Sequence, residues 1–490
     1  MRKEATLAAV LVTVLATACI LWIPELAMAA EQKTAKTKAK AKAASTIEEL
    51  KPALTDLSDQ IWRFAETALR ETRSAEVLAR FAEEEGFTVE RGVAGMPTAF
   101  VASYGQGRPI LGVLGEYDAL PGLSQKAQTE REALEDGGAG HGCGHNLFGA
   151  GSLGAAIAVK RLIESGALEG TIRFYGTPAE ESVGGKLYMI REGLFDDLDI
   201  AIAWHPSNEI RADTEGSQAL VDFVVEFHGK AAHAAYDPWN GRSAVDALEI
   251  FTFALNQMRE HVRPTVRMHY AIVDGGAVPN VVPETAKLWC WLRDSKHERV
   301  DALLERARDI ARGAALAAGV EGELRVQSGM YEMLVNRTGA RLIQANLEAL
   351  GPIPFTPEEH EFARTLQSTF DVEAKGLNAK AEPLDETPGE PSGGSTDVAD
   401  VSWNVPTLHL SVTTAPGGTP WHAWPVVASG GTSIGHKGMV HAAKAMAMTL
   451  IDLYADPSKR DAIRQEFEKQ TEDKSYGGYI PDGPPPIPED

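Results

Sequence analysis

The sequence predicts an α/β protein with a second, inserted α+β domain, and two patterns lead to this prediction. Short apolar runs typical of buried strands alternate with helical repeats, which indicates an open sheet between helices. Near Ser217 the pattern changes to alternating strands and two long helices, and the α/β pattern returns at Asn336. We therefore expect a mixed α/β sheet with helices on both faces, interrupted by a compact α+β insert. The buried strand-like runs are 99–104, 110–115, 171–176 and 199–204.

Composition narrows the class of protein. The 490 residues are 44% hydrophobic and 24% charged, as in folded globular proteins, and the length suggests two or three domains. The net charge of −22 argues against nucleic-acid binding, which favours basic surfaces. Of the three cysteines, only Cys143 lies in a context typical of a functional site, so we expect no disulfide framework.

The N-terminus resembles a secretory signal. Two basic residues precede an apolar run from Ala5 to Ile23, and small residues follow up to Ala30. This pattern predicts a signal peptide over residues 1–30 and an exported protein, periplasmic or secreted. The apolar run also has the length of a membrane anchor, and an uncleaved anchor is the alternative.

Changes in composition divide the rest of the chain. Lys, Ala and Thr alternate after the signal, and Gly, Pro and Asp are frequent beyond Tyr476, so we expect a polar linker and a mobile tail. The predicted parts are a linker over 31–45, the α/β domain over 46–216 and 334–456, the insert over 217–333, and a C-terminal tail over 457–490.

A glycine-rich loop at 140–151 is the strongest chemical signal. His141, Cys143 and His145 are separated only by glycines, which allow a close approach of the backbone, and a helical repeat starting at Asn146 follows. Imidazole and thiolate groups at this spacing predict a metal site. The alternative is a helix entry with a buried free thiol.

Polar residues follow the predicted strands. Asp118 follows the run 110–115, the pair Glu180 and Glu181 follows 171–176, and His205 follows 199–204. Because the carboxyl ends of neighbouring parallel strands share one edge, these residues should meet there. One glutamate can bind a cation while the other transfers a proton.

Four further residues lie in loops or at a helix start. His233 and Asn280 lie in Gly-rich or Pro-rich turns of the insert, where they can reach a ligand or only hydrogen-bond within their loops. His422, in a Gly-Pro-Trp loop, competes with His436 as a further site histidine.

In their order along the chain, these segments resemble the dinuclear metallo-aminoacylase and carboxypeptidase family. Within it they are most similar to the amidohydrolase branch that contains aminobenzoyl-glutamate hydrolase. The resemblance spans about Thr46 to Tyr454. The matching segments are 117–121, 142–145, 178–181, 204–205, 229–234, 280–283, 394–397 and 419–422.

The resemblance implies roles for individual residues. It implies two divalent metal ions, zinc or manganese, with Cys143 in the bridging position, Glu180 as general base, and Asp118 orienting a ligand. His233 and Asn280 would polarise the scissile carbonyl or hold the substrate, with His233 acting across a homodimer formed by the lid, which is the insert. The implied metal ligands are Cys143, His145, Glu181, His205 and His422.

The leading hypothesis is metal-dependent hydrolysis of N-acyl or N-aroyl amino acids or dipeptides, with aminobenzoyl-glutamate the best single substrate. One alternative is a dipeptidase of the same family, and another is a non-catalytic binding protein that keeps the fold. A further alternative is a thiol amidase in which Cys143 is the nucleophile. It assigns no role to Glu181, His205 and His422. A partner subunit is a further expectation, whereas an exported signal differs from the mainly cytoplasmic relatives of this branch.

Overall fold

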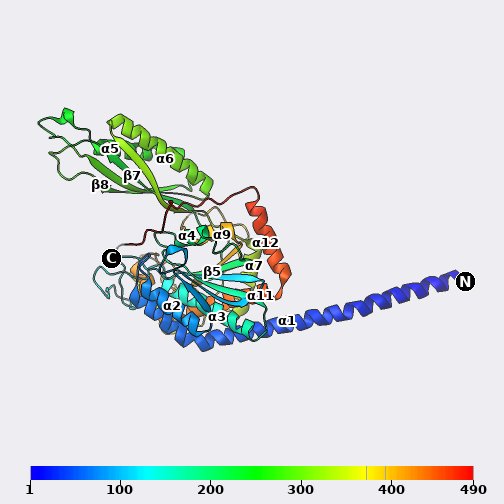
Figure 1. Cartoon of the computed structure of the whole chain (residues 1–490). Helices are drawn as coiled ribbons and strands as arrows, with labels where there is room; N and C mark the ends of the chain where they lie inside the picture. Colours follow the sequence, from blue (N-terminus) through cyan, green and yellow to red (C-terminus); the bar gives the residue numbers. More distant parts are fainter. Residues whose placement is uncertain (1, 371, 392, 489–490) are drawn as a thin grey trace.

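A computed structural model describes residues 2–370, 372–391 and 393–488 (Figure 1). The first helix, α1, spans Arg2–Phe64, and of residues 2–32 only the helical backbone is described. The side chains of the predicted signal peptide therefore lie outside the described residues. Where side chains are described, no helix is both long and apolar enough to cross a membrane.

A seven-stranded mixed sheet forms the larger domain, in the order β1-β2-β4-β3-β5-β11-β6. Its four central strands, β4, β3, β5 and β11, are parallel, and antiparallel strands flank them on both sides. The carboxyl ends of the central strands therefore meet at one edge. The strands are β1 Thr88–Arg91, β2 Phe100–Gln106, β3 Ile110–Gly115, β4 Gly170–Gly176, β5 Ile200–Ser207, β6 Arg211–Ala212 and β11 Thr407–Thr413.

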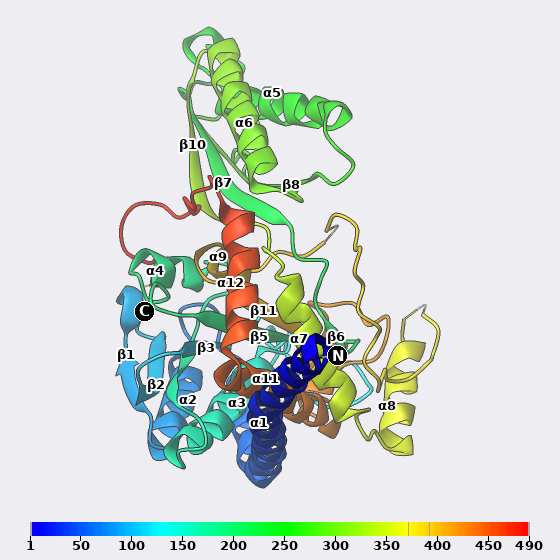
Figure 2. The same cartoon turned by 90° about the vertical axis from the view of Figure 1, so that its right-hand side faces the viewer.

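Helices cover both faces of this sheet, as predicted (Figures 1 and 2). Helices α1, α2, α3 and α11 lie on the face away from the insert, and α4, α9 and α12 lie on the side of the insert. Helix α7 packs against β6 and β11. The helices beyond α1 are α2 Thr72–Glu84, α3 His145–Glu164, α4 Gly185–Arg191, α7 Arg337–Leu350, α8 Pro357–Ser368, α9 Val398–Asn404, α10 Trp424–Gly430, α11 Ser433–Ala455 and α12 Pro457–Thr471.

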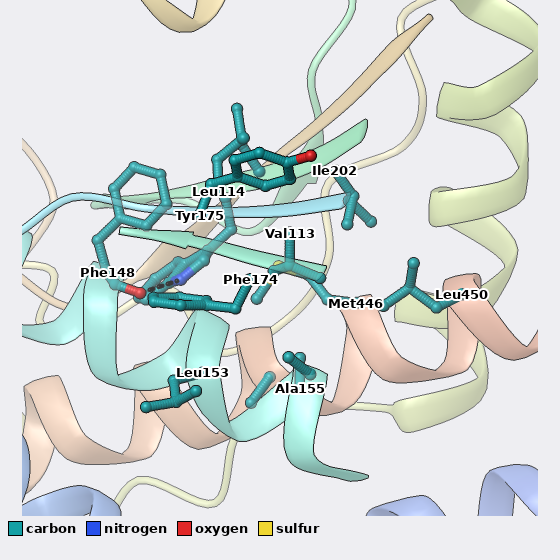
Figure 3. Packing of buried hydrophobic residues seen from close by; sticks show 14 of the residues in the cluster. Val113, Leu114, Phe148, Leu153, Ala155, Phe174, Tyr175, Ile202, Met446 and Leu450 are labelled. Carbon is teal, nitrogen blue, oxygen red and sulfur yellow. Dashed lines mark hydrogen bonds between the residues drawn. The ribbon is translucent and has the colours of Figure 1, made fainter. Parts of the chain in front are cut away.

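The core forms where the central strands meet α3 and α11 (Figure 3). Val113, Phe174 and Ile202 of the strands are fully buried, as are Leu153 of α3 and Leu450 of α11. Burying an aliphatic or aromatic side chain of this size stabilises the fold by roughly 1.5–3 kcal/mol. This packing fixes the sheet edge from which the polar residues project.

The inserted domain, residues 219–330, is a four-stranded antiparallel sheet in the order β10-β7-β9-β8 with two helices packed against it. It agrees with the predicted α+β insert, since alternating strands bury one face against amphipathic helices. The elements are β7 Ala219–His228, α5 Ala244–Met258, β8 Arg267–Asp274, β9 Thr285–Asp294, α6 His297–Ala318 and β10 Glu321–Met330.

Two expectations for the ends of the chain need correction. Residues 31–45, expected as a linker, are helical within α1, and Ala39 and Ala43 are buried there. In the expected tail, α12 is a regular helix, and Tyr476 and Tyr479 pack on Tyr331 with ring centroids 5.0 and 5.3 Å away. Lys-Ala repeats are good helix formers, and the tyrosines supply the apolar area that anchors the tail.

The core makes a testable prediction. Leu153→Ala should lower the free energy of unfolding by about 2–5 kcal/mol because a cavity replaces fully buried methyl groups. Leu316→Ala is the control, because Leu316 is 85% exposed and its truncation should change stability by less than about 0.5 kcal/mol. Urea unfolding followed by circular dichroism measures both, and equal losses would contradict this description of the core.

Candidate metal-dependent active site

The predicted site residues of the larger domain converge at the carboxyl edge of the central strands. Asp118 follows β3, Glu180 and Glu181 follow β4, and His205 lies on β5. His422 lies in the loop after β11. The parallel topology thus brings together residues that are far apart in the chain.

Cys143, His145 and His205 form one cluster. One ligand atom from each lies within 4.8 Å of those of the other two, and Cys143 Sγ is 3.4 Å from His205 Nε2. The Nδ1 atom of His205 lies 2.7 Å from the carbonyl oxygen of Pro206, a contact that favours a proton on Nδ1 and leaves Nε2 free to bind a cation. Burial lowers the pKa of His205 to about 4, which keeps the ring in the neutral form that a metal requires.

Cys143, Glu181 and His422 form a second cluster of the same size. His422 Nε2 is 3.4 Å from Glu181 Oε2, and its backbone N–H donates to the carbonyl of Gly142 at 3.0 Å. Burial lowers the pKa of His422, so this imidazole also favours its neutral form. Since Cys143 belongs to both clusters, its thiolate would be a ligand that both metal positions can use.

The atoms present fit a pair of divalent cations. His145 Nε2 and Glu181 Oε1 are buried and make no hydrogen bond to any described residue. Burial raises the pKa of the Cys143 thiol, so a thiolate there needs a compensating positive charge. Thiol, imidazole and carboxylate donors with this arrangement match zinc and related transition metals.

Asp118 orients one ligand from each cluster. Its Oδ1 lies 2.9 Å from His145 Nδ1, and its Oδ2 accepts from the backbone N–H of Glu181 at 2.9 Å. An ionised carboxylate accepts the Nδ1 proton of His145, so Nε2, the atom that faces the cluster, is the ring nitrogen that would bind a cation. Asp118 therefore contacts a member of each cluster, and its orienting role stays a prediction.

Glu180 lies in a densely anionic environment. Burial raises its pKa well above the ordinary value, and the charges of Glu116, Glu181 and Asp397 raise it further. A carboxyl group with a raised pKa can exchange a proton near neutral pH, as a general base and acid must.

Sequence reasoning gave no role to Glu116 or Lys186. Lys186 Nζ is fully buried and donates to Glu116 and to Asp397, at 2.6 Å in each case. Glu116 Oε2 is 3.1 Å from His145 Nε2. Two sequence features could have indicated these residues. Lys186 lies at an otherwise apolar helix start, and Glu116 is an acidic residue two positions before Asp118.

A strained turn separates the two adjacent glutamates. Ala179 adopts φ +62, a left-handed conformation that alanine seldom occupies, and its N–H donates to Glu71 Oε1 at 2.9 Å. Glu71 is buried, and burial together with the charge of Asp118 raises its pKa to about 8. This support for the turn lets Glu181 join the second cluster while Glu180 joins a cluster with Glu116 and His145.

Four singled-out residues do not join the clusters. His141 is buried with Nε2 3.0 Å from the carbonyl of Ile61, and His436 Nε2 lies 2.9 Å from Asp59, so both contact α1. His233 and Asn280 are exposed neighbours in loops of the inserted domain, where His233 forms a bridge with Val281. Within one chain, the expected catalytic His233 and substrate-binding Asn280 are therefore not at the site.

A cavity of about 540 Å³ opens from the clusters. The inserted domain lines it with Trp291 and Arg293 of β9, and Arg293 Nη1 donates to Ser395 at 3.1 Å. The guanidinium lies 5.1 Å from the centroid of the Trp291 ring, and its Nε is buried without a hydrogen bond to a described residue. Arg293 was not predicted, since a strand arginine carries no sequence signal of its own.

This fold and site belong to a known class of enzyme. Residues 112–425 match the Peptidase family M20/M25/M40, and the chain is a member of this family, whose members are metallopeptidases and amidohydrolases. The resemblance inferred from the sequence motifs is thereby confirmed.

Individual relatives cover nearly the whole chain. One of the proteins that make up the p-aminobenzoyl-glutamate hydrolase of Escherichia coli is 39% identical over 460 residues, covering 89% of this chain and 96% of that protein. The human Xaa-Arg dipeptidase is 31% identical over 459 residues, covering 89% and 94%.

Solved structures share the fold. A putative aminohydrolase from methicillin-resistant Staphylococcus aureus has a TM-score of 0.64 at 17% identity, over 85% of this chain and all of that one. A Bacillus subtilis protein described as a dinuclear metal-binding peptidase has a TM-score of 0.58 at 18% identity, over 83% and 99%.

The cluster geometry predicts metal stoichiometry. His422→Ala should lose one of two bound metal equivalents, because it removes a ligand of the second cluster only. His436→Ala is the matched control and should keep both, since its ring pairs with Asp59. Inductively coupled plasma mass spectrometry of the purified variants gives the counts, and full retention by His422→Ala would assign the ligand elsewhere.

Proposed function

We propose that the chain hydrolyses the amide bond of N-acyl or N-aroyl amino acids, using a water molecule activated at two divalent cations. The observation that carries the proposal is the pair of ligand clusters that share Cys143, with Glu180 beside them. Two cations bound there would polarise the scissile carbonyl and lower the pKa of the attacking water.

The residues of the chain supply the remaining steps. Glu180 takes the proton of the attacking water and returns it to the leaving amine. Asp118 holds His145 and the backbone of Glu181 in place throughout. Because both ligand clusters and the base are present, a catalytically silent binding protein is the weaker alternative, and the raised pKa of Cys143 disfavours a thiol nucleophile.

The favoured substrate is aminobenzoyl-glutamate or a related aroyl amino acid. The cavity combines an apolar wall with the Arg293 guanidinium, which suits a substrate that has an apolar acyl group and a free carboxylate. The E. coli relative is named for p-aminobenzoyl-glutamate, whereas the mammalian relatives are named as Xaa-Arg dipeptidases, so a dipeptide is the second candidate.

We further propose zinc or manganese as the metal, and export through the N-terminal signal with retention by an uncleaved anchor as the alternative. The ligand set supports zinc, with its thiolate and imidazoles, and carboxylate ligation also accommodates manganese. A partner subunit is part of the proposal because the E. coli relative is one of the subunits of a hydrolase.

Chelation tests the reaction class. The purified mature chain should hydrolyse aminobenzoyl-glutamate, lose that activity after chelation, and regain it with zinc or manganese. Glu180→Gln should keep both metals but lose at least about 100-fold in kcat, because the base is gone while the ligands remain. No cleavage by a protein with two bound metals would reject this substrate, and cleavage that survives chelation would reject the mechanism.

The inserted domain has the features of a homodimer surface. Strand β8 is an edge strand, and Ile272 and Val273 on it are 58% and 57% exposed. Phe253 on α5 is 67% exposed. An apolar edge strand beside an apolar helix face favours pairing with a second copy. A dimer would also give the exposed His233 a route to the partner's site.

Complementation tests the dimer and His233 together. His233→Ala and Glu180→Gln should each be inactive alone, but mixing them after dissociation and reassociation should restore about a quarter of wild-type activity, because each heterodimer has one complete site. Restoration should vanish when both chains also carry Phe253→Asp, and light scattering should then show monomers. A mixture that stays inactive although heterodimers form would place His233 outside the partner's site.

A further inference from the structure

The cavity extends beyond the metal ligands along strand β11, and this inner part has no role in the chemistry above. Ser411 of β11 pairs with His205 of β5 and with Arg211 of β6, and His409 lies two residues earlier on β11. Because side chains alternate along a strand, His409 and Ser411 project from the same face as His205. At about 3.3 Å per residue, His409 lies about 7 Å further from the sheet edge than Ser411.

Asp213 fixes the orientation of His409. His409 Nδ1 lies 2.6 Å from Asp213 Oδ2, and Asp213 also accepts from Arg211 Nε at 2.7 Å and from the Ser411 hydroxyl at 2.8 Å. An ionised carboxylate can only accept, so His409 Nδ1 carries a proton toward Asp213. Nε2 is the ring atom that Asp213 leaves free.

Three other polar groups of the cavity already have partners, whereas the buried Ser217 hydroxyl, which also lines the cavity, makes no hydrogen bond to a described residue. The Asn336 side chain accepts from the first turn of α7 and donates to a backbone carbonyl, and the Thr407 hydroxyl donates to a backbone carbonyl. Ser411 donates to Asp213. By contrast, His409 Nε2 makes no hydrogen bond to any described residue, although His409 lines the cavity. It is an oriented ring nitrogen without a partner among the described residues.

Apolar side chains line the same cavity. They are Met333 and Val335, and Leu220, Trp291 and Met330 of the inserted domain. Methionine side chains adapt to flat groups, and an indole offers a face for stacking. A cavity that is lined by these side chains, by the ligand clusters and by His409 therefore suits an aromatic ring with a polar substituent.

We propose that this inner pocket binds the acyl group of the substrate and that His409 Nε2 accepts a hydrogen bond from a donor at the far end of an aromatic ring. The inference rests on the proposed amide hydrolysis and narrows its substrate class to aroyl amino acids with an amino or hydroxyl group para to the carbonyl. His409 determines specificity and does not touch the bond that is cleaved. The competing explanation is structural, with His409 and Asp213 only tying the short strand β6 to β11.

A pair of substrates separates these explanations. The first is 4-aminobenzoyl-glutamate, and the second is 4-methylbenzoyl-glutamate, whose methyl group matches the amine in size but cannot donate a hydrogen bond. The metal-loaded full chain should prefer the amino substrate by at least about fivefold in kcat/KM, the value of one ordinary hydrogen bond. A purely structural role predicts a preference that is independent of residue 409.

Two variants of His409 test whether this residue causes the preference for the amino substrate. His409→Asn keeps a donor toward Asp213 but lacks the acceptor at the position of Nε2, so the preference should fall to about one. His409→Gln offers an amide oxygen near that position and should restore part of the preference. An unchanged ratio in His409→Asn, with amide hydrolysis intact, would overturn the pocket assignment while leaving the proposed function standing.

Binding of the acyl fragments keeps the two proposals distinguishable. Calorimetry should show that the metal-loaded full chain binds 4-aminobenzoate more tightly than 4-methylbenzoate, and that His409→Asn loses the difference. If this result were found while neither glutamate conjugate was hydrolysed, the pocket assignment would hold and the proposed function would fail. Equal binding of both acids by the wild-type protein would overturn the pocket assignment.

Discussion

The buried negative charge at the carboxyl edge of the central sheet is the constraint on which the rest of the structure depends. Glu116, Glu180 and Asp397 interact there out of contact with water, and Lys186 is the cation that donates to two of them. Carboxylates in such surroundings lose hydration and repel one another, so they require compensating positive charge. Binding of cations at the shared Cys143 would supply that charge.

The order of the strands in the sheet brings the buried acidic residues to one edge. Strands β3, β4, β5 and β11 each end at the same edge, and each contributes site residues in the loop or at the strand end that follows. The strained turn at Ala179 then places two adjacent glutamates in different clusters. A single rigid scaffold thus holds the residues proposed as ligands, base and orienting carboxylate, and their different surroundings come from local burial and hydrogen bonds.

The inserted domain lines the cavity but contributes no residue to the two ligand clusters that share Cys143. It contributes Trp291 and Arg293 to the wall, so the opening of the pocket depends on how this domain sits over the sheet. The C-terminal segment restrains that position, because Tyr476 donates to Asp400 of α9 at 2.9 Å and Tyr479 donates to Asp301 of α6 at 2.6 Å. The inserted domain is therefore held in place by contacts that lie outside the metal clusters.

The sequence by itself determined the fold class and the chemical character of the site. Buried strand runs, the glycine-rich loop around Cys143, and the pair Glu180 and Glu181 are local patterns. Such patterns can be recognised in the sequence without knowing which distant residues pack against them. Tertiary structure alone places His422 beside Glu181 and His436 against Asp59 of α1, because this difference comes from packing and not from local sequence. It also revealed Lys186, Arg293 and His409, whose roles come from side chains distant in sequence. The tail differed from expectation for the same reason, since the apolar area that holds its tyrosines belongs to other elements.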